Sequence, residues 1–260
     1  YEITTRLVGS EMCIRDRRAG MELPETDYSA EDRKDRDIKT RLLEINKIAA
    51  TYYYHQLKSE AGKSGLDYLV KRGLSDKTIN SFGLGFAPQS TGELYRMLKD
   101  KGYDDEILKE SGLFTYEKGV RDKFWNRVIF PIMDINNKVI GFGGRVMGDA
   151  KPKYLNSPET KLFDKSRNLY GLNAARTARK NNLIICEGYM DVISLHQAGF
   201  TQAVASLGTA LTPGHARLMK RYTDNVLITY DSDEAGVKAA LRAIPIPVSY
   251  THLTLPTKLE

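Results

Sequence analysis

From residue 183 to residue 243, short apolar runs alternate regularly with segments of helical pattern, and this rhythm limits the possible folds more than any other feature. The runs LIIC, QAVASL and NVLITY are followed by the helix-like stretches YMDVISLHQAG, TPGHARLMKRY and EAGVKAALRAI. Such alternation predicts a parallel sheet with right-handed crossover connections. In a sheet of this kind, functional residues lie beyond the carboxyl ends of the strands.

Carboxylates directly follow two of these strands. Glu187 and Gly188 end the first, with Asp191 in the next turn of chain, and Asp231 and Asp233 end the third. If both strands are central and parallel, these acids meet at one edge, and their mutual repulsion calls for a cation. Mg²⁺ prefers hard oxygen ligands and often lies between carboxylates and phosphates. We therefore expect a catalytic metal site formed by Glu187, Asp231 and Asp233 and supported by Asp191, although Asp191 and Asp233 would each also suit a helix N-cap.

The preceding region has another pattern, in which helices come before a small mixed sheet. Apolar residues spaced by three and four predict an amphipathic helix over roughly 30–59. Ser75 is a typical N-cap for a later, shorter helix. The runs RVIFPIMD and VIGFGGRVM predict a hairpin that turns at Asn136 and Asn137.

Three further expectations concern the end of this region. The pair Gly143–Gly144 within a strand pattern indicates a β-bulge, since no dinucleotide-binding glycine fingerprint is present. PKYLNS predicts an extended segment, and residues 168–180 predict a helix. The whole chain is thus expected to be an α/β protein, with an α+β amino-terminal subdomain over residues 38–180 and a parallel α/β domain over residues 181–247.

Charge is distributed unevenly along the chain. The net charge is +6, but residues 121–180 contain 13 Lys and Arg against 5 Asp and Glu, whereas residues 184–236 contain 3 against 6. A basic segment before an acidic one suggests a polyanion next to a divalent cation, although two solvated faces of unlike charge would give the same counts. The candidate nucleic-acid and nucleotide contacts in the basic segment are Arg145, Lys153, Tyr154, Asn156, Lys165, Arg121, Lys123 and Arg127.

These candidates differ in the alternatives open to them. Lysine and arginine would neutralise phosphates, but a merely solvated loop is an equal alternative for Arg121, Lys123 and Arg127. Tyr154 could stack on a base or pack in the core, and Asn156 could offer neutral hydrogen bonds.

Composition excludes several classes of protein. The 260 residues are 41% hydrophobic and 28% charged, as in globular proteins, and no apolar run is long enough to predict a membrane span. Only Cys13 and Cys186 occur, and neither they nor the four histidines have metal-ligand spacing, so we expect no zinc site and a cytoplasmic location. Cys186 is expected to be buried, and His196 and His215 are expected to pack or face solvent without catalysing.

The motifs EGYMD and TYDSDEAG resemble the Toprim signature of primases, topoisomerases and related nucleases. The segments LDYLVKRGLSDKTINSFGLGFAP, RDKFWNRVIFPI and residues 142–176 resemble bacterial replicative DNA primases of the DnaG type. The resemblance implies a Toprim domain that binds Mg²⁺ or Mn²⁺ and synthesises RNA primers from ribonucleoside triphosphates on single-stranded DNA. It also implies a replicative helicase as a partner and gives no reason to expect a membrane.

Two other interpretations remain open at this stage. A Toprim nuclease or topoisomerase fragment would share the acidic motifs, and a nucleic-acid-binding module could keep the fold without catalysis. The upstream basic segment favours the primase.

The ends of the chain differ from the rest. Residues 1–17 and 248–260 resemble translated sequencing-adapter DNA and are interpreted as artefactual, and residues 18–37 predict a linker. Relative to the primase family, we then expect a truncated Toprim domain and no zinc-binding or helicase-binding domain. Weak or absent priming by this chain alone would follow.

Overall fold

The computed structural model describes residues 30–89, 92–117, 119–208, 210–231 and 234–243, together with the backbone of 252–254. The expectations for residues 1–17, for most of the linker and for much of 248–260 lie outside the described residues. The chain divides into two units, 1–38 and 39–260, and the second contains the elements that form the site. Within the described residues, no helix has the length and apolar character needed to cross a membrane.

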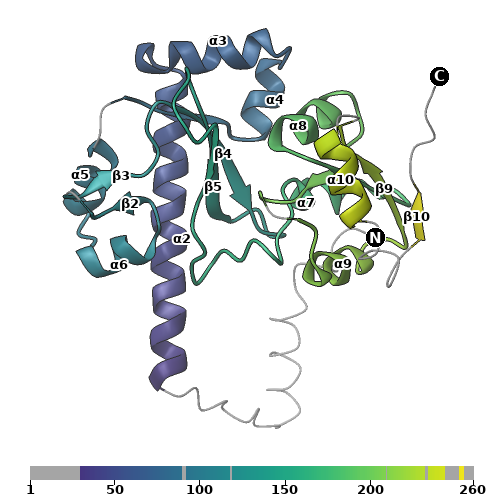
Figure 1. Ribbon diagram of the computed structural model, residues 1–260. Coiled ribbons are helices and arrows are strands. Elements are labelled where there is room, and N and C mark those ends of the chain that lie inside the picture. The colour runs from purple at the N-terminus through teal and green to yellow at the C-terminus, as the bar shows by residue number, and fades with distance from the viewer. Residues whose placement is uncertain are drawn as a thin grey trace, which may run out of the picture. The chain divides into compact units, whose positions relative to one another are not determined.

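The long helix α2 spans Ala30–Leu57 and confirms the helix expected over roughly 30–59. Its buried stripe includes Leu42, Ile45, Ala49 and Tyr53, at the spacing of one helix face. The Tyr53 ring meets the Phe142 ring edge-on with centroids 5.5 Å apart. The stripe therefore packs on the antiparallel sheet, beside which α2 runs (Figure 1).

Short elements follow α2. They are η1 (Glu60–Gly62), α3 (Lys63–Lys71), α4 (Asp76–Ser81), β1 (Gly85–Ala87), α5 (Glu93–Asp100), α6 (Asp105–Glu110), β2 (Phe114–Thr115) and β3 (Arg121–Asp122). Ser75 is the N-cap of α4, as predicted, because its hydroxyl accepts a hydrogen bond from the Thr78 N–H.

An antiparallel sheet with the order β1-β4-β5-β6 forms the centre of this part; the later strands are β4 (Arg127–Met133), β5 (Val139–Val146) and β6 (Tyr154–Asn156). The predicted β4–β5 hairpin is confirmed, with Asn137 at a φ of 60° in its turn. The bulge expected at Gly143–Gly144 is wrong, because both glycines pair in register and the irregularity falls between Ile132 and Met133.

The helix expected over residues 168–180 is also wrong in extent, since α7 spans only Leu172–Ala175. The Tyr170 N–H donates to the Ala205 carbonyl at 2.9 Å, and the Ala205 N–H donates back to Tyr170 at 3.1 Å. This strand-like pairing holds the backbone at Tyr170 extended, so a helix can begin only after Gly171.

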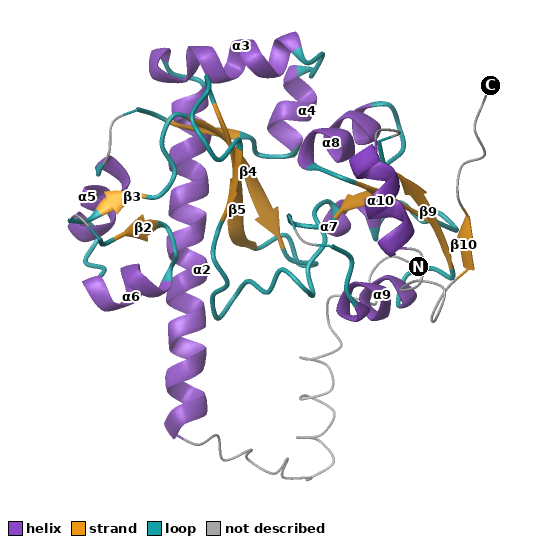
Figure 2. Ribbon diagram, viewed as in Figure 1, coloured by secondary structure: helices purple, strands orange, loops and turns teal. Residues whose placement is uncertain are grey.

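The predicted alternation from residue 183 is confirmed. The elements are β7 (Leu183–Cys186), α8 (Tyr189–Gln197), β8 (Ala203–Ala205), α9 (Pro213–Lys220), β9 (Asn225–Thr229), α10 (Glu234–Ala243) and β10 (His252–Thr254). The strands are all parallel in the order β10-β9-β7-β8, and they form a group separate from the antiparallel strands (Figure 2).

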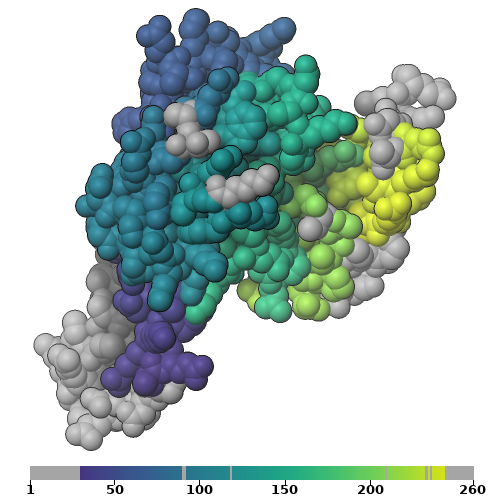
Figure 3. Space-filling model, turned by 60° about the vertical axis from the view of Figure 1, so that its left-hand side comes forward, coloured from purple at the N-terminus to yellow at the C-terminus, as the bar shows by residue number. Residues whose placement is uncertain are grey.

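Alternate residues of β7 serve two different layers. Ile184 and Cys186 share a core cluster with α8 and with β4, whereas Leu183 and Ile185 share one with α9. The first cluster therefore joins the antiparallel and parallel sheets in one core, and the teal and green segments form a continuous surface in Figure 3. Cys186 is buried, as expected.

Candidate active site

The two acids at the strand ends lie side by side. β7 and β9 are neighbours, with Cys186 opposite Thr229, so Glu187 and Asp231 leave the same edge of the sheet. The Asp231 N–H donates a hydrogen bond of 3.0 Å to Oε1 of Glu187. Both residues are exposed, and the expected convergence of these two acids is confirmed. Tyr230 lies between β9 and Asp231, and burial, helped by the charge of Glu187, raises its pKa to about 12.

Gly236, in the first turn of α10, allows the helix backbone to approach Glu187 and Asp231 closely. A Cβ atom at this position would lie 2.2 Å from the Asp231 carbonyl oxygen and 2.7 Å from Oε1 of Glu187. Any side chain would displace one of them. The glycine in the motif TYDSDEAG is thus required by a close approach of the backbone to both acids.

Asp191 was expected to be a supporting metal ligand, but in the structure its carboxylate binds the backbone at the start of α8. Its Oδ2 accepts a hydrogen bond of 2.9 Å from the Gly188 N–H at the start of α8, where Gly188 is the N-cap and Asp191 is the N3 residue. Partial burial of the carboxyl group raises the pKa of Asp191, and the charge of Asp231 raises it further. The N-cap alternative for Asp191 is wrong in position, because Gly188 is the N-cap of α8, although the Asp191 carboxylate does cap the backbone there.

Asp233, the remaining acid, lies outside the described residues. Among those that are described, no group of three or more His, Cys, Asp or Glu side chains could hold a metal ion. What the described chain provides is therefore a pair of adjacent exposed carboxylates, Glu187 and Asp231. Neither forms an ion pair with a described basic residue, so their charges are not neutralised within this part of the chain.

Tyr189 links the acidic edge to the antiparallel sheet. Its ring stacks on Phe130 of β4 at 4.9 Å between centroids, and its hydroxyl donates to Oδ1 of Asn156 at 2.8 Å. Because Tyr189 follows Gly188 directly, these contacts fix the start of α8 against β4 and β6. Sequence reasoning missed this residue, and its one signal was an aromatic side chain immediately after the Glu-Gly pair.

Basic and aromatic side chains lie close to the same edge. The Arg145 guanidinium lies over the Tyr68 ring at 4.1 Å from its centroid, and that of Arg72 lies over the same ring at 6.0 Å. Arg72 also lines a small surface hollow with Asp191, and its charge acts to lower the pKa of that acid. Arg72 and Tyr68 were not singled out from the sequence, although they lie in the quoted segment that resembles the primase family.

Tyr154 is partly packed against the protein and partly exposed, so both core packing and base stacking are compatible with its position. One side of its ring stacks on Tyr189 at 6.4 Å, while 40% of the residue remains exposed. Burial raises the pKa of Tyr154, so its hydroxyl stays protonated at neutral pH. The exposed part lies next to Arg145, its partner in the β5–β6 ladder.

Lys123 and Lys165 form a pair of like charges. Partial burial lowers the pKa of Lys123, and the charge of Lys165 lowers it further. Within the described part of the chain, neither is in an ion pair. Arg121 and Lys153 are exposed and remain candidates for phosphate contacts.

Arg127 does not belong to this exposed set. It is only 3% exposed, and its Nη1 donates to the carbonyls of Gly144 at 3.2 Å and Lys153 at 3.4 Å. Burial lowers the pKa of Arg127. The expectation that Arg127 extends the surface track is corrected, because its side chain points inward from the start of β4 and its guanidinium binds carbonyls of β5 and of the segment before β6.

Asn156 is also occupied within the chain. Its Nδ2 donates to the Leu207 carbonyl at 2.9 Å while its Oδ1 accepts from Tyr189. Both ends of the amide thus join β6 to the parallel-sheet part, and a direct contact with nucleic acid stays a prediction. His196 and His215 are packed against backbone carbonyls, as expected of non-catalytic residues.

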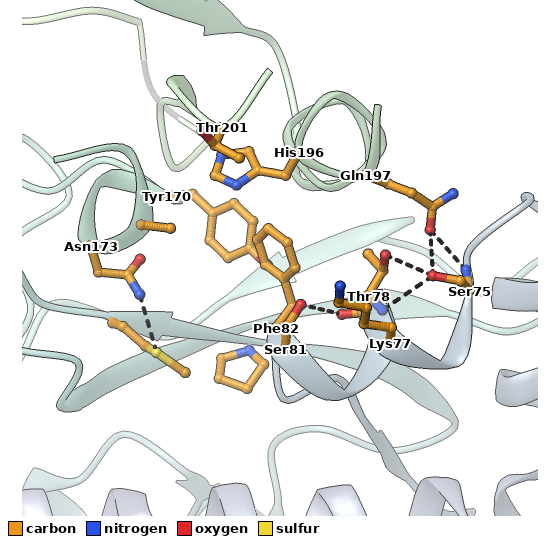
Figure 4. A pocket seen from close by; sticks show the side chains of 14 residues that line it. Ser75, Lys77, Thr78, Ser81, Phe82, Tyr170, Asn173, His196, Gln197 and Thr201 are labelled. Carbon is orange, nitrogen blue, oxygen red and sulfur yellow. Dashed lines mark hydrogen bonds between the residues drawn. The ribbon is translucent and has the colours of Figure 1, made fainter. Parts of the chain in front are cut away.

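A cavity of about 340 Å³ lies on another side of α8, between α4, α7 and the β4 end (Figure 4). Phe82 and Tyr170 stack in it, and polar groups surround them. Several of these groups already have partners, since Gln197 Oε1 accepts from the Ser75 N–H at 2.8 Å and Asn173 donates to Asn137 at 2.9 Å. The cavity is a seam between elements in which several polar atoms are satisfied, while the buried Tyr170 hydroxyl has no hydrogen-bond partner among the described residues.

Comparison with known families identifies the arrangement. Residues 52–176 match the family described as DNA primase catalytic core, N-terminal domain, and residues 184–255 match the Toprim-like family. The DNA primase of Clostridium acetobutylicum is 49% identical over 215 residues, 82% of this chain and 36% of the relative. This chain belongs to the DnaG-type DNA primase family. The DNA primase of Deinococcus radiodurans, 48% identical over 209 residues, covers 78% of this chain and 36% of the relative.

Solved primase structures agree with this assignment. A DnaG primase catalytic domain bound to ssDNA gives a TM-score of 0.79 at 40% identity, over 86% of this chain and 72% of that chain. The RNA polymerase domain of Mycobacterium tuberculosis primase DnaG gives 0.78 at 32%, over 85% and 77%. The chain spans 36% of the length of the two curated primases above. The Toprim-like match reaches residue 255, past the expected domain end at 247.

Proposed function

We propose that this chain is the catalytic core of a DNA primase, which synthesises short RNA primers on a single-stranded DNA template. The reaction joins the 3′-hydroxyl of a growing RNA to the α-phosphate of a ribonucleoside triphosphate and releases pyrophosphate. The observation that supports it best is the adjacent pair Glu187 and Asp231, tied by Tyr189 to the strands that hold Arg145 and Tyr154. Nothing in the comparisons favours a nuclease or a topoisomerase.

The acidic pair fits a hard divalent cation. Both side chains offer carboxylate oxygens at one sheet edge, and within the described residues Glu187 uses only Oε1 in the bond to Asp231. We propose that Glu187 and Asp231, with Asp233, hold Mg²⁺ or Mn²⁺. Such a cation stabilises negative charge on a transferring phosphoryl group. The chain itself sets the spacing of the acids, through the Asp231 N–H bond and the close approach of Gly236.

The basic residues beside this edge would bind the nucleic acid and the nucleotide. Arg145 and Arg72, both over Tyr68, are held in place by that ring, and Lys153 is exposed on the loop leading into β6. The pair Lys123 and Lys165 would neutralise phosphate charge that the described chain leaves unpaired. A solved relative is described as a DnaG catalytic domain bound to ssDNA, which supports single-stranded DNA as the template here.

The remaining assignments rest on the family. RNA primer and ribonucleoside triphosphates would be the product and substrates, the replicative helicase would be a partner of the whole protein, and the bacterial cytoplasm would be its location. In the proposed site Asp191 positions α8 through the Gly188 N–H, which keeps Glu187 at the sheet edge.

A primer-synthesis assay tests the proposal. The chain is incubated with circular single-stranded DNA, labelled ribonucleotides and Mg²⁺ or Mn²⁺, and the products are separated by size. We expect weak synthesis of short RNA, reduced at least 100-fold by Glu187→Gln or Asp231→Asn, because removal of a charge-stabilising group costs about that much. Glu234→Gln, which removes an exposed acid that forms an ion pair with Lys238, is the matched control.

Direct metal binding separates the alternatives. Mn²⁺ titration followed by electron paramagnetic resonance should show a site in the parent chain that Glu187→Gln and Asp231→Asn weaken and Glu234→Gln does not. Metal and DNA binding without RNA synthesis would leave a non-catalytic binding module. DNA cleavage without synthesis would contradict the primase.

A further inference from the structure

Trp125, the only tryptophan of the chain, is an exposed aromatic side chain in the loop between β3 and β4. It is 43% exposed, and within the described residues its ring makes no aromatic or cation–π contact and its indole N–H has no hydrogen-bond partner. Single exposed aromatic residues are common on protein surfaces, so the case for a binding contact at Trp125 depends on how the ring is held and on what lies beside it.

The chain around Trp125 holds the ring outward. Burial alternates along this stretch, with Asp122 and Phe124 buried, Lys123 partly exposed and Trp125 exposed. The Phe124 ring meets Tyr53 and Phe142 edge-on in the core, so the next side chain must point away from it.

The backbone after Trp125 is also fixed. The Asn126 N–H donates to the Pro88 carbonyl at 3.1 Å, its side-chain Nδ2 donates to the Met147 carbonyl at 3.0 Å, and the Met147 N–H donates back at 2.8 Å. With a φ of 47°, Asn126 turns the chain into β4. The indole is therefore presented by a rigid loop and cannot fold into the core.

The surroundings of the ring are basic. Lys123 is partly exposed two residues before Trp125, and Arg121 is exposed two residues before Lys123. The charge of Lys165 acts on Lys123 and lowers its pKa. Among the described residues none of these three cations is in an ion pair. An aromatic ring next to unpaired cations is the combination that binds a single-stranded nucleic acid, with a base on the ring and phosphates on the ammonium groups.

We propose that Trp125 is a stacking platform for an unpaired base of single-stranded DNA, whose adjoining phosphates are bound by Lys123 and Lys165. The inference rests on the proposed function, since it specifies how the template is held. A duplex is excluded as the occupant, because its bases are stacked on one another and present no free face to an exposed ring. A protein partner would need an apolar patch, and the exposed and partly exposed residues that precede Trp125 in the sequence, Arg121 and Lys123, are charged.

Intrinsic fluorescence reads out this contact directly, because Trp125 is the only indole in the chain. The whole chain is titrated with oligothymidylate, with blunt duplex DNA of the same length, and with sodium polyphosphate, which has phosphates and no bases. We expect strong quenching by the single strand alone. Equal quenching by duplex or polyphosphate, or no quenching by the single strand, would overturn the proposal.

Variants then measure the affinity with a labelled oligonucleotide. Trp125→Ala and Trp125→Leu should weaken single-strand binding about 5- to 100-fold, and Trp125→Phe, which keeps a ring, should retain most of it. The salt dependence should be unchanged in these variants, whereas Lys123→Ala should reduce its slope by about 0.7. Phe200→Ala, which removes a 49% exposed aromatic residue elsewhere, is the control and should bind normally.

The fate of the proposed function is read separately. Suppose that single-stranded DNA quenches Trp125 and that the Trp125 variants bind it more weakly, but that the parent chain makes no RNA. The stacking contact would then stand and the catalytic proposal would be rejected. RNA synthesis by the parent chain, with unchanged affinity in Trp125→Ala and Trp125→Leu of normal circular dichroism, would reject the stacking contact alone.

Discussion

Two polar side chains, the partly buried Asn156 and the buried His215, fix the basic segment to the parallel-sheet part of the molecule. The His215 ring is fully buried, with Nδ1 accepting from the Thr212 N–H at 3.2 Å and Nε2 facing the Lys165 carbonyl at 2.8 Å. Since Nδ1 accepts, Nε2 bears the proton and donates to Lys165. A neutral histidine thus sets the backbone position of a lysine that we expect to contact phosphate.

His215 should make stability depend on pH. Burial lowers its pKa, more than the carbonyl contacts and the charge of Asp164 raise it. Below about pH 6.5 the unfolded chain therefore binds a proton that the folded chain does not, and the unfolding free energy falls as the pH decreases. We expect His215→Gln to flatten this decline between pH 7 and 5, measured by urea unfolding at each pH.

The matched control is His55→Gln, which changes an exposed histidine on α2. It should leave the pH profile of the parent chain intact. Some slope should remain in His215→Gln, because burial also lowers the pKa of His196. An identical profile for His215→Gln and the parent chain would contradict the assignment.

At the residue scale, the sequence predicts the role of a side chain when that role depends on residues close to it along the chain. Glu187 and Asp231 could be placed because each follows an apolar strand directly, and Ser75 because its capping partner is three residues away. Arg127 could not, since its burial depends on the carbonyls of Gly144 and Lys153, which come close only when β4, β5 and β6 pair.

At the element scale, close packing of strands and helices depends on glycines whose role the sequence does not show. A Cβ atom on Gly143 would lie 2.4 Å from Cζ of Tyr189, a residue far along the chain, and one on Gly144 would lie 2.8 Å from Phe124. The sequence does not show this long-range contact, and the glycine pair was therefore expected to form a bulge. The short α7 has a similar cause, since the pairing of Tyr170 with Ala205 replaces the predicted helix.

Gly143→Ala should therefore destabilise the fold and disturb the acidic edge. The added methyl group must displace the Tyr189 ring, and overpacking of this kind costs about 1–3 kcal/mol. Gly141→Ala in the same strand, where the nearest atom would be 3.2 Å away, should cost less. Chemical denaturation measures both losses.

A double-mutant cycle identifies the contact. Because Tyr189→Leu removes the ring that the methyl group meets, the cost of Gly143→Ala should be smaller in a Tyr189→Leu background. Equal costs in the two backgrounds would show that the strain arises elsewhere.

At the scale of the whole molecule, the helical and hairpin part shares a core with the parallel-sheet part. One cluster of buried side chains includes Val128 and Phe130 of β4 together with Ile184 and Cys186 of β7. The seam is closed at its edge by Gln197, which accepts from Ser75 and donates to the Gly73 carbonyl at 2.7 Å. The basic segment and the acidic parallel-sheet part are thus held in one relative position by this continuous core.

This continuity predicts a single cooperative unfolding transition within residues 39–260. Trp125 reports on the helical and hairpin part, and the Cys186 thiol, whose pKa burial raises to about 11, reports on β7. In a Cys13→Ser background, Trp125 fluorescence and alkylation of Cys186 should give the same urea midpoint, because neither part keeps a complete core without the other.

Gln197→Ala tests the edge of the seam. Loss of its hydrogen bonds at an exposed position should lower the unfolding free energy by about 0.5–1.5 kcal/mol. Both probes should shift together, because the buried aromatic contact between Phe130 and Tyr189 remains. A Cys186 transition that separates from the Trp125 transition, in the parent chain or in Gln197→Ala, would show that the two parts unfold independently and that the shared core does not couple them.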